Sequence, residues 1–131
     1  MKILLDTHIW LWGHLAPERI GKRLTQAMLA PSNQLWLSPI SVWECLVLAE
    51  KKRVALKGDA REWIARALDQ APMHQASLNF EVVYASRTLA LEHEDPADRF
   101  LAATALVYDL VLATADHRLL DSRGFQTLAN R

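Results

Sequence analysis

The chain has 131 residues, 51% of them hydrophobic, and its 15 basic and 15 acidic side chains give a formal net charge of zero. A chain of this length and composition can bury a core and is too apolar to be disordered, so we expect one domain over residues 1–131. The balanced charge argues against a protein that coats nucleic acid through bulk positive charge, but it does not exclude a local contact with RNA.

The single cysteine, Cys45, excludes an intrachain disulfide and is typical of a protein from a reducing compartment. Asp6 interrupts the apolar N-terminus, and no small-residue cleavage site follows it. No run of the chain reaches the roughly 18 apolar residues that are needed to span a bilayer. We therefore expect a cytoplasmic protein without a membrane segment.

In the first half of the chain, short apolar runs alternate with segments of helical spacing. KILLD at residues 2–6 predicts a buried parallel strand that ends in an acid, and QLWLS at 34–38 predicts a second strand. The apolar spacing between these strands predicts a helix over residues 16–30. PISVWECLVLAEKKR at 39–53 predicts a helix with Ser41 as N-cap and Glu44 three positions later.

The second half repeats this alternation. Asp59 and Glu62 form the pattern of a capping box at the start of a helix over 58–70, and Asn79 is placed to cap a helix over 79–92. A further helix over 96–109 is predicted to have Asp95 as its N-cap and Pro96, a residue favoured there, at its first position. We expect strands at 73–78 and 110–116, and an edge strand at 124–128.

Strands that alternate with helices predict an α/β fold with a mostly parallel central sheet. In such sheets, functional sites form beyond the carboxyl ends of the strands. Four acids lie at these positions or in the first turn of a predicted helix: Asp6, Glu44, Asp98 and Asp116.

Each of these acids has two readings. Taken singly, each could cap a helix or turn, because acids at helix starts bind free N–H groups and oppose the helix dipole. Taken together, four carboxylates on one edge of a sheet repel each other unless a cation lies between them. An all-oxygen set without a Cys/His cluster indicates a hard cation such as Mg²⁺ or Mn²⁺, which promotes phosphodiester hydrolysis.

Four motifs in order along nearly the whole chain resemble a known family. LLDTHIWLW at 4–12, SPISVWE at 38–44, DPADRFLAATA at 95–105 and LATAD at 112–116 resemble the PIN-domain ribonucleases, and among them the VapC-type toxins of type II toxin–antitoxin systems. The resemblance implies a three-layer α/β/α domain, metal-dependent endoribonuclease activity on RNA, a cognate antitoxin protein as partner, and a homodimer.

The same resemblance implies roles for individual residues. By motif position, the acidic catalytic set is Asp6, Glu44, Asp98 and Asp116. Asp6, Asp98 and Asp116 are the expected direct ligands of Mg²⁺ or Mn²⁺, and Glu44 is expected to act through water. The family's hydroxyl residues near the site match Thr7, Ser41 and Thr114.

Three further residues near these acids could have either a functional or a structural role. Arg99 could contact a substrate phosphate, or it could have the structural role of neutralising Asp95 or Glu94, which we favour. His8 and His117 each lie within two residues of an expected site acid, and packing is a better reading for them than proton transfer.

Two other functions compete with the ribonuclease. A PIN-like fold could serve as an inactive protein-interaction module, although such a module has no need for all four acids. A phosphatase or phospho-acceptor domain needs a second acid close after its nucleophilic Asp or a suitable lysine, and DTHIW at 6–10 contains no second acid.

Overall fold

A parallel sheet forms the centre of the chain in a computed structural model that describes residues 1–131. Its strands follow the order β3-β2-β1-β4-β5, and every neighbouring pair is parallel. The predicted α/β fold with a mostly parallel sheet is therefore confirmed, and the sheet is in fact wholly parallel. The strands are β1 (Lys2–Leu5), β2 (Gln34–Leu37), β3 (His74–Gln75), β4 (Val111–Thr114) and β5 (Gln126–Ala129).

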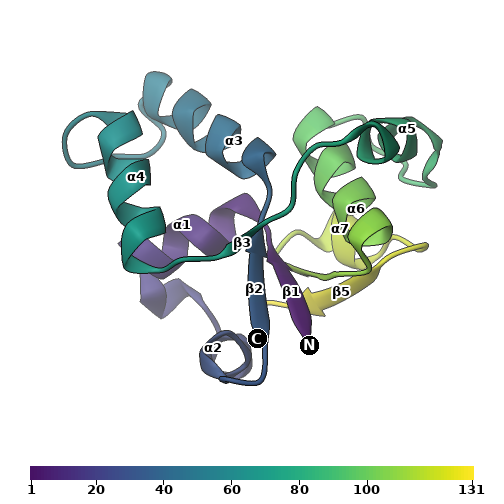
Figure 1. Ribbon diagram of the computed structural model, residues 1–131, viewed down its shortest axis with the longest axis horizontal. Coiled ribbons are helices and arrows are strands. Elements are labelled where there is room, and N and C mark those ends of the chain that lie inside the picture. Colours follow the sequence, from purple (N-terminus) through teal and green to yellow (C-terminus); the bar gives the residue numbers. More distant parts are fainter.

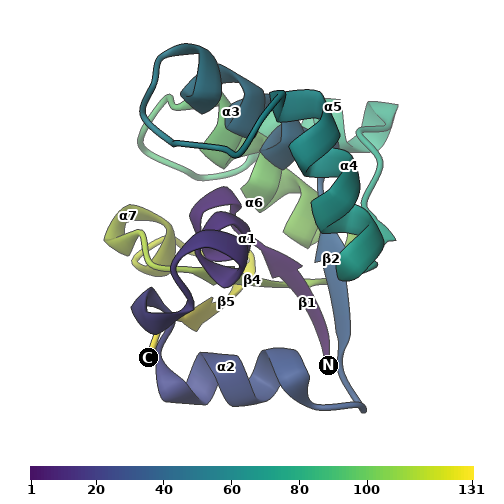
Figure 2. The same cartoon turned by 90° about the vertical axis from the view of Figure 1, so that its left-hand side faces the viewer.

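Helices cover both faces of this sheet, as a three-layer α/β/α architecture requires. In Figure 1, α1 and α4 lie on one side of β1 and β2, and α5 and α6 lie on the other side. Figure 2 shows that α2 lies at the opposite end of the molecule from α3. The helices are α1 (Thr7–Leu15), α2 (Lys22–Leu29), α3 (Pro39–Glu50), α4 (Ala60–Gln70), α5 (Phe80–Thr88), α6 (Pro96–Tyr108) and α7 (His117–Leu120), with a short 3₁₀ helix, η1 (Pro17–Arg19).

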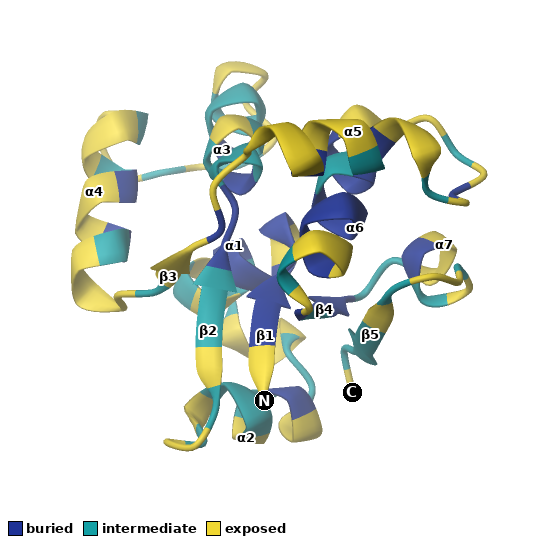
Figure 3. Cartoon of the chain, turned by 45° about the vertical axis from the view of Figure 1, so that its right-hand side comes forward, coloured by how far each residue is buried: buried dark blue, intermediate teal, exposed yellow.

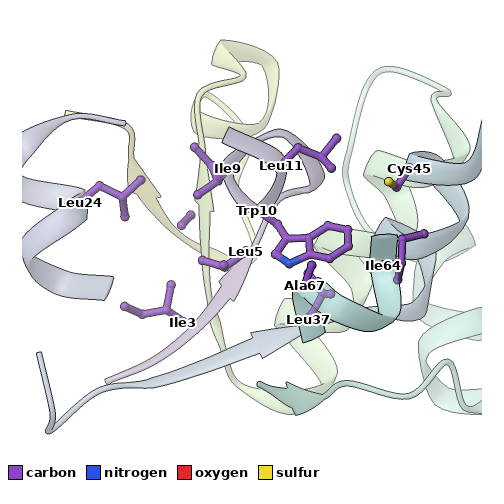
Figure 4. Packing of buried hydrophobic residues seen from close by; sticks show 11 residues of the cluster. Ile3, Leu5, Ile9, Trp10, Leu11, Leu24, Leu37, Cys45, Ile64 and Ala67 are labelled. Carbon is purple, nitrogen blue, oxygen red and sulfur yellow. The ribbon is translucent and has the colours of Figure 1, made fainter. Parts of the chain in front are cut away.

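The larger part of the core lies between the sheet and helices α1, α2, α3 and α4. Ile3 and Leu5 of β1 point to this side, because alternate residues of a strand face opposite sides of a sheet. Trp10 of α1 is only 1% exposed and fills the space near Leu37 and Ile64 (Figure 4). This core holds α1 firmly against the end of β1.

The second part of the core lies on the other face of the sheet. Leu4 of β1 and Leu112 of β4 pack against Leu101, Ala102 and Ala105 of α6. Figure 3 shows that β1 and the middle of α6 are buried, whereas most of α5 is exposed. Burial of β1 on both faces explains why its sequence is a continuous apolar run. None of the helices combines the length and the apolar character required to cross a lipid bilayer.

The strands and helices α3 to α6 lie close to their predicted positions, although α5 ends at Thr88 and β3 has only two residues. Helices α1 and α7 were not predicted, and two predicted helix starts differ from the structure. The predicted helix over 16–30 is wrong in its first half, because α2 begins only at Lys22. Ile20 has an extended backbone (φ −92°, ψ 128°) and separates η1 from α2. Gly21 precedes α2 and donates its N–H to Asn130 Oδ1 at 2.7 Å. Tertiary contacts with the C-terminal segment therefore decide where this helix begins.

The predicted N-cap of α3 is also wrong. Ser38 is the N-cap, its Oγ accepts a hydrogen bond from the N–H of Ile40 at 3.1 Å, and Pro39 occupies the first turn. Because the helix begins before Ser41, both Ser41 and Glu44 lie inside it. Asp59, Asn79 and Asp95 are the N-caps of α4, α5 and α6, as the sequence predicts.

Candidate functional site

Acidic side chains from four elements line one cavity of about 320 Å³ at the carboxyl edge of the sheet. β1 and β4 are neighbours in the sheet, with Leu5 opposite Ala113, so the residues that follow them lie side by side. Asp6 follows β1 directly and Asp116 follows β4 after Ala115. Glu44 enters from α3 and Asp98 from the first turn of α6, so the structure brings all four expected acids to one cavity.

Asp6 caps a helix and also faces the cavity. Its Oδ1 accepts a hydrogen bond from the N–H of Thr7 at 2.7 Å, which caps α1, and its Oδ2 accepts one from Thr114 Oγ1 at 2.6 Å. Burial raises the pKa of this carboxyl, although both hydrogen bonds oppose the increase. Thr114 therefore orients the Asp6 carboxylate from the neighbouring strand.

Glu44 belongs to a small network of hydroxyl groups. Thr7 Oγ1 donates a hydrogen bond to Glu44 Oε1 and lies 2.9 Å from the hydroxyl of Ser41. Burial is the main cause that raises the pKa of Glu44, and the negative charge of Asp6 adds to it. All three expected hydroxyl residues, Thr7, Ser41 and Thr114, thus contact an expected acid or each other.

Asp98 is the acid whose carboxylate receives the least stabilisation from hydrogen bonds and cations of the protein. Asp95 is the N-cap of α6, and its Oδ1 accepts a hydrogen bond from the N–H of Asp98 at 3.1 Å. This helix start directs Asp98 into the cavity, where the residue is 9% exposed. Its carboxylate accepts no side-chain hydrogen bond; Arg118 Nη2 lies 3.6 Å and His93 Nε2 lies 3.8 Å from its Oδ2. Burial and the neighbouring acids raise the pKa of Asp98 to about 7.

Asp116 differs from the other three acids. It caps α7 by accepting a hydrogen bond from the N–H of Arg118 at 2.9 Å, as its position before the HRLL segment suggests. Hydrogen bonding from the Arg118 side chain holds the pKa of Asp116 below its ordinary value. Capping and facing the cavity are therefore compatible roles for this residue, as they are for Asp6.

The donor set of the cavity fits a divalent cation in its chemistry. It offers carboxylate oxygens, the ligands that Mg²⁺ and Mn²⁺ prefer, and the partly buried Asp98 carboxylate has no hydrogen bond to satisfy it. No three of the acids point at one position in this arrangement. Glu44 is turned toward Thr7, and Asp116 toward Arg118. Binding of a cation by three of these acids therefore requires their side chains to rotate.

Arg99 lies away from the cavity and is only 5% exposed. Its Nε donates a hydrogen bond to the carbonyl of Ser86, Nη1 donates to those of Leu91 and His93, and Nη2 donates to that of Leu89. The guanidinium thus holds the segment between α5 and α6 in place.

The position of Arg99 has a simple geometric reason. Successive residues of a helix point about 100° apart, so Arg99 cannot share the direction of Asp98. The carboxylates that we expected it to neutralise are not its partners, because Glu94 pairs instead with Arg87 at 3.3 Å. We therefore do not propose the substrate contact that the sequence had left open for Arg99.

Two cationic or titratable residues of the site were missed in the sequence. Arg118 lies two positions after Asp116 and pairs with it. An arginine in the first turn after an acidic N-cap is a local pattern from which this pair could have been predicted. His93 has both ring nitrogens buried without a hydrogen-bond partner, and no local signal in the sequence marks it. Of the two histidines considered from sequence, His8 lines the cavity and His117 lies on the exposed side of α7.

Comparisons with known proteins agree with this arrangement. A family model described as "PIN domain" matches residues 3–124. Ribonuclease VapC22 of Mycobacterium tuberculosis (strain ATCC 25618 / H37Rv) is 32% identical over 124 residues, which cover 92% of each chain.

Two solved structures share the fold. DNA-bound VapBC from Salmonella typhimurium matches with a TM-score of 0.73 at 16% identity, over 100% of this chain and 99% of that one. VapBC-5 from Mycobacterium tuberculosis, a member of the VapBC family of toxin–antitoxin systems, matches with a TM-score of 0.63 at 17% identity, over 99% and 98%.

Proposed function

The chain belongs to the PIN-domain family as a VapC-type protein, and on this premise we propose that it is a metal-dependent endoribonuclease, the toxin of a toxin–antitoxin pair. Its substrate is RNA, and its cofactor is Mg²⁺ or Mn²⁺. The observation that carries the proposal is the cavity at the carboxyl ends of β1 and β4, where acids from four elements meet.

The unsatisfied carboxylate of Asp98 is the main support for a cation at this site. A partly buried carboxylate without a hydrogen bond is costly, and other negative charges around it increase the cost. The fold does not require an acid at this position, because Asp95 already caps α6. A divalent cation removes this cost by neutralising several carboxylates at once.

In this proposal Asp6, Asp98 and Asp116 hold the metal directly, and Glu44 acts through water. A bound Mg²⁺ or Mn²⁺ supplies Lewis-acid stabilisation of the charge that develops on the phosphate oxygens, and it lowers the pKa of water. Thr114 keeps Asp6 in its orientation, and Thr7 together with Ser41 holds Glu44 at the edge of the cavity. These hydrogen bonds thus fix the carboxylates that would hold the cation.

We also infer a cognate antitoxin protein as partner, because structures similar to this chain include members of toxin–antitoxin systems. An antitoxin that covers the acidic cavity would block access of RNA to it. The homodimer and the cytoplasmic location expected from the family are part of the same proposal.

Titration of Mn²⁺ into the purified, antitoxin-free protein by calorimetry tests the proposed function. We expect the wild type to bind Mn²⁺ and to cleave RNA in its presence. Asp6→Asn and Asp98→Asn are expected to lose both properties, because each keeps the side-chain shape but removes one negative charge from the donor set. Asp69→Asn, which removes an exposed acid on α4, is the matched control and is expected to behave like the wild type.

The outcomes separate the proposal from its alternative. If the Asp98→Asn variant cleaves RNA at the wild-type rate, this carboxylate has no part in catalysis. Absence of Mn²⁺ binding and of RNA cleavage in the wild type would favour the inactive protein-interaction module. Circular dichroism of each variant verifies that a loss of binding does not come from unfolding.

A further inference from the structure

Arg118 connects two of the acids that line the cavity. Its Nη2 donates a hydrogen bond to Asp116 Oδ2 at 2.9 Å, and its Nε lies 3.3 Å from Asp116 Oδ1. The same Nη2 lies 3.6 Å from Asp98 Oδ2. One cationic side chain thus bridges a carboxylate at the start of α7 and a carboxylate at the start of α6.

This arginine is free to leave the acids. Its side chain is 59% exposed, and its guanidinium has no hydrogen-bond partner other than Asp116. By contrast, the buried Arg99 is held by four backbone carbonyls. A long, exposed side chain of this kind can turn into solvent at little cost in packing.

We propose that Arg118 is an internal counter-ion that a divalent cation displaces from Asp98 and Asp116 when it binds. The inference rests on the proposed metal-dependent function. A guanidinium and a metal ion both require the same carboxylate oxygens, so the two cations compete for them. The pairing stabilises the acids without metal and weakens the binding of metal to the same extent.

A place for the displaced guanidinium lies beside the acidic cavity. Arg118 also lines a second cavity of about 490 Å³, together with Arg123 and the two acids Glu92 and Asp121. A guanidinium suits the paired oxygens of a phosphate. Once it is displaced from Asp98 and Asp116, the guanidinium of Arg118 is free to pair with a phosphate of the RNA.

Calorimetric titration of Mn²⁺ into Arg118→Gln and Arg123→Gln variants tests the displacement. We expect Arg118→Gln to bind Mn²⁺ roughly two- to fivefold more tightly than the wild type, the range of an exposed ion pair. Arg123→Gln removes the same charge from the same segment, but Arg123 pairs with no carboxylate. This control is expected to retain the wild-type affinity.

Three results would contradict either the displacement of Arg118 or the metal-dependent function. Equal or weaker binding of Mn²⁺ by Arg118→Gln contradicts the displacement. An equal gain in Arg123→Gln also contradicts it, because the gain would then come from net charge rather than from competition. A wild type that binds no Mn²⁺ contradicts the proposed metal-dependent function itself, so the two failures are distinguishable.

Cleavage of RNA at saturating Mn²⁺ tests the second role of Arg118. We expect kcat/KM of Arg118→Gln to fall roughly tenfold, the loss expected for one charge-assisted phosphate contact, and Arg118→Lys to recover part of it. A variant that binds Mn²⁺ more tightly and yet cleaves like the wild type would show that Arg118 makes no contact with substrate.

Discussion

Single residues at this site have more than one role. Asp6 and Asp116 each cap the helix that follows a strand, and each also faces the acidic cavity. The hydrogen bond to the helix N–H uses only part of the acceptor capacity of a carboxylate, which has two oxygens. The sequence offered a capping role or a site role as alternatives for these residues. The structure allows each of them to have both roles.

The stability of the site depends on Arg99, although this residue lies outside the cavity. Arg99→Ala leaves carbonyls of the 86–93 segment without their buried donor, so we expect the free energy of unfolding to fall by about 3 kcal/mol. Chemical denaturation monitored by circular dichroism measures this change.

Arg87→Ala is the control for this prediction, because it removes an exposed arginine of the same segment, whose partner is the exposed Glu94. The expected change for this surface pair is within about 0.5 kcal/mol. If Arg99→Ala unfolded at the wild-type denaturant concentration but lost its activity, Arg99 would be a substrate contact after all.

At the scale of the elements, local signals identify most helix starts. Asp59, Asn79 and Asp95 cap their helices as predicted, because a side-chain oxygen and an N–H two or three residues later need no help from the rest of the chain. Ser38 and Ser41 both offer such an oxygen, and Pro39 decides between them by favouring the first turn of the helix. The Ser-Pro pair at 38–39 is therefore the local signal for the start of this helix.

The start of α2 depends instead on contact with the C-terminal residue. A Cβ atom on Gly21 would lie 1.8 Å from the carbonyl carbon of Arg131, and the N–H of Leu24 donates to the carbonyl oxygen of Arg131 at 2.9 Å. We expect Gly21→Ala to reduce the free energy of unfolding by about 2 kcal/mol, because the backbone must move apart.

Gly13→Ala provides the matched control, since the nearest atom to a Cβ there is Ile20 Cδ1 at an ordinary 3.8 Å. This substitution lies within α1, where alanine is favoured over glycine, so we expect no loss and a gain of up to about 1 kcal/mol. Thermal melting of both variants measures whether Gly21→Ala is destabilised and Gly13→Ala is not. Equal melting temperatures for Gly21→Ala and the wild type would mean that the close packing of the C-terminus is not needed for α2.

At the scale of the whole molecule, the acidic cavity makes stability depend on pH. The pKa of Asp98 is raised from 3.8 to about 7, so between these values the folded protein keeps a proton that the unfolded chain has released. Without divalent metal, stability is therefore expected to fall as the pH rises from about 4 to about 7. Burial shifts the pKa of Asp6 and Glu44 in the same direction.

Melting temperatures at pH 5 and pH 8 in the presence of a chelator measure this effect. We expect the wild type to lose about 3 °C more than Asp98→Asn between these pH values, and Mn²⁺ at pH 8 to restore the wild type alone. The same pH dependence in both proteins would contradict the assignment of this loss to Asp98.

The sequence alone determined the α/β class, the strands, most helix caps and the acids to examine. These features depend on alternation of apolar runs, on caps that act within three residues, and on motifs that resemble a family. The order β3-β2-β1-β4-β5 then brings together acids that are far apart in the chain.

Only the tertiary structure decided the surroundings of these acids. Arg99 points away from the cavity, Arg118 bridges Asp98 and Asp116, and the C-terminus sets the start of α2. Such contacts depend on the direction of side chains after helices have packed on the sheet, and on residues distant in sequence. Apart from the pairing of Arg118 with Asp116, which is two residues away, a local pattern carries no information about these contacts, because they form only once the chain has folded.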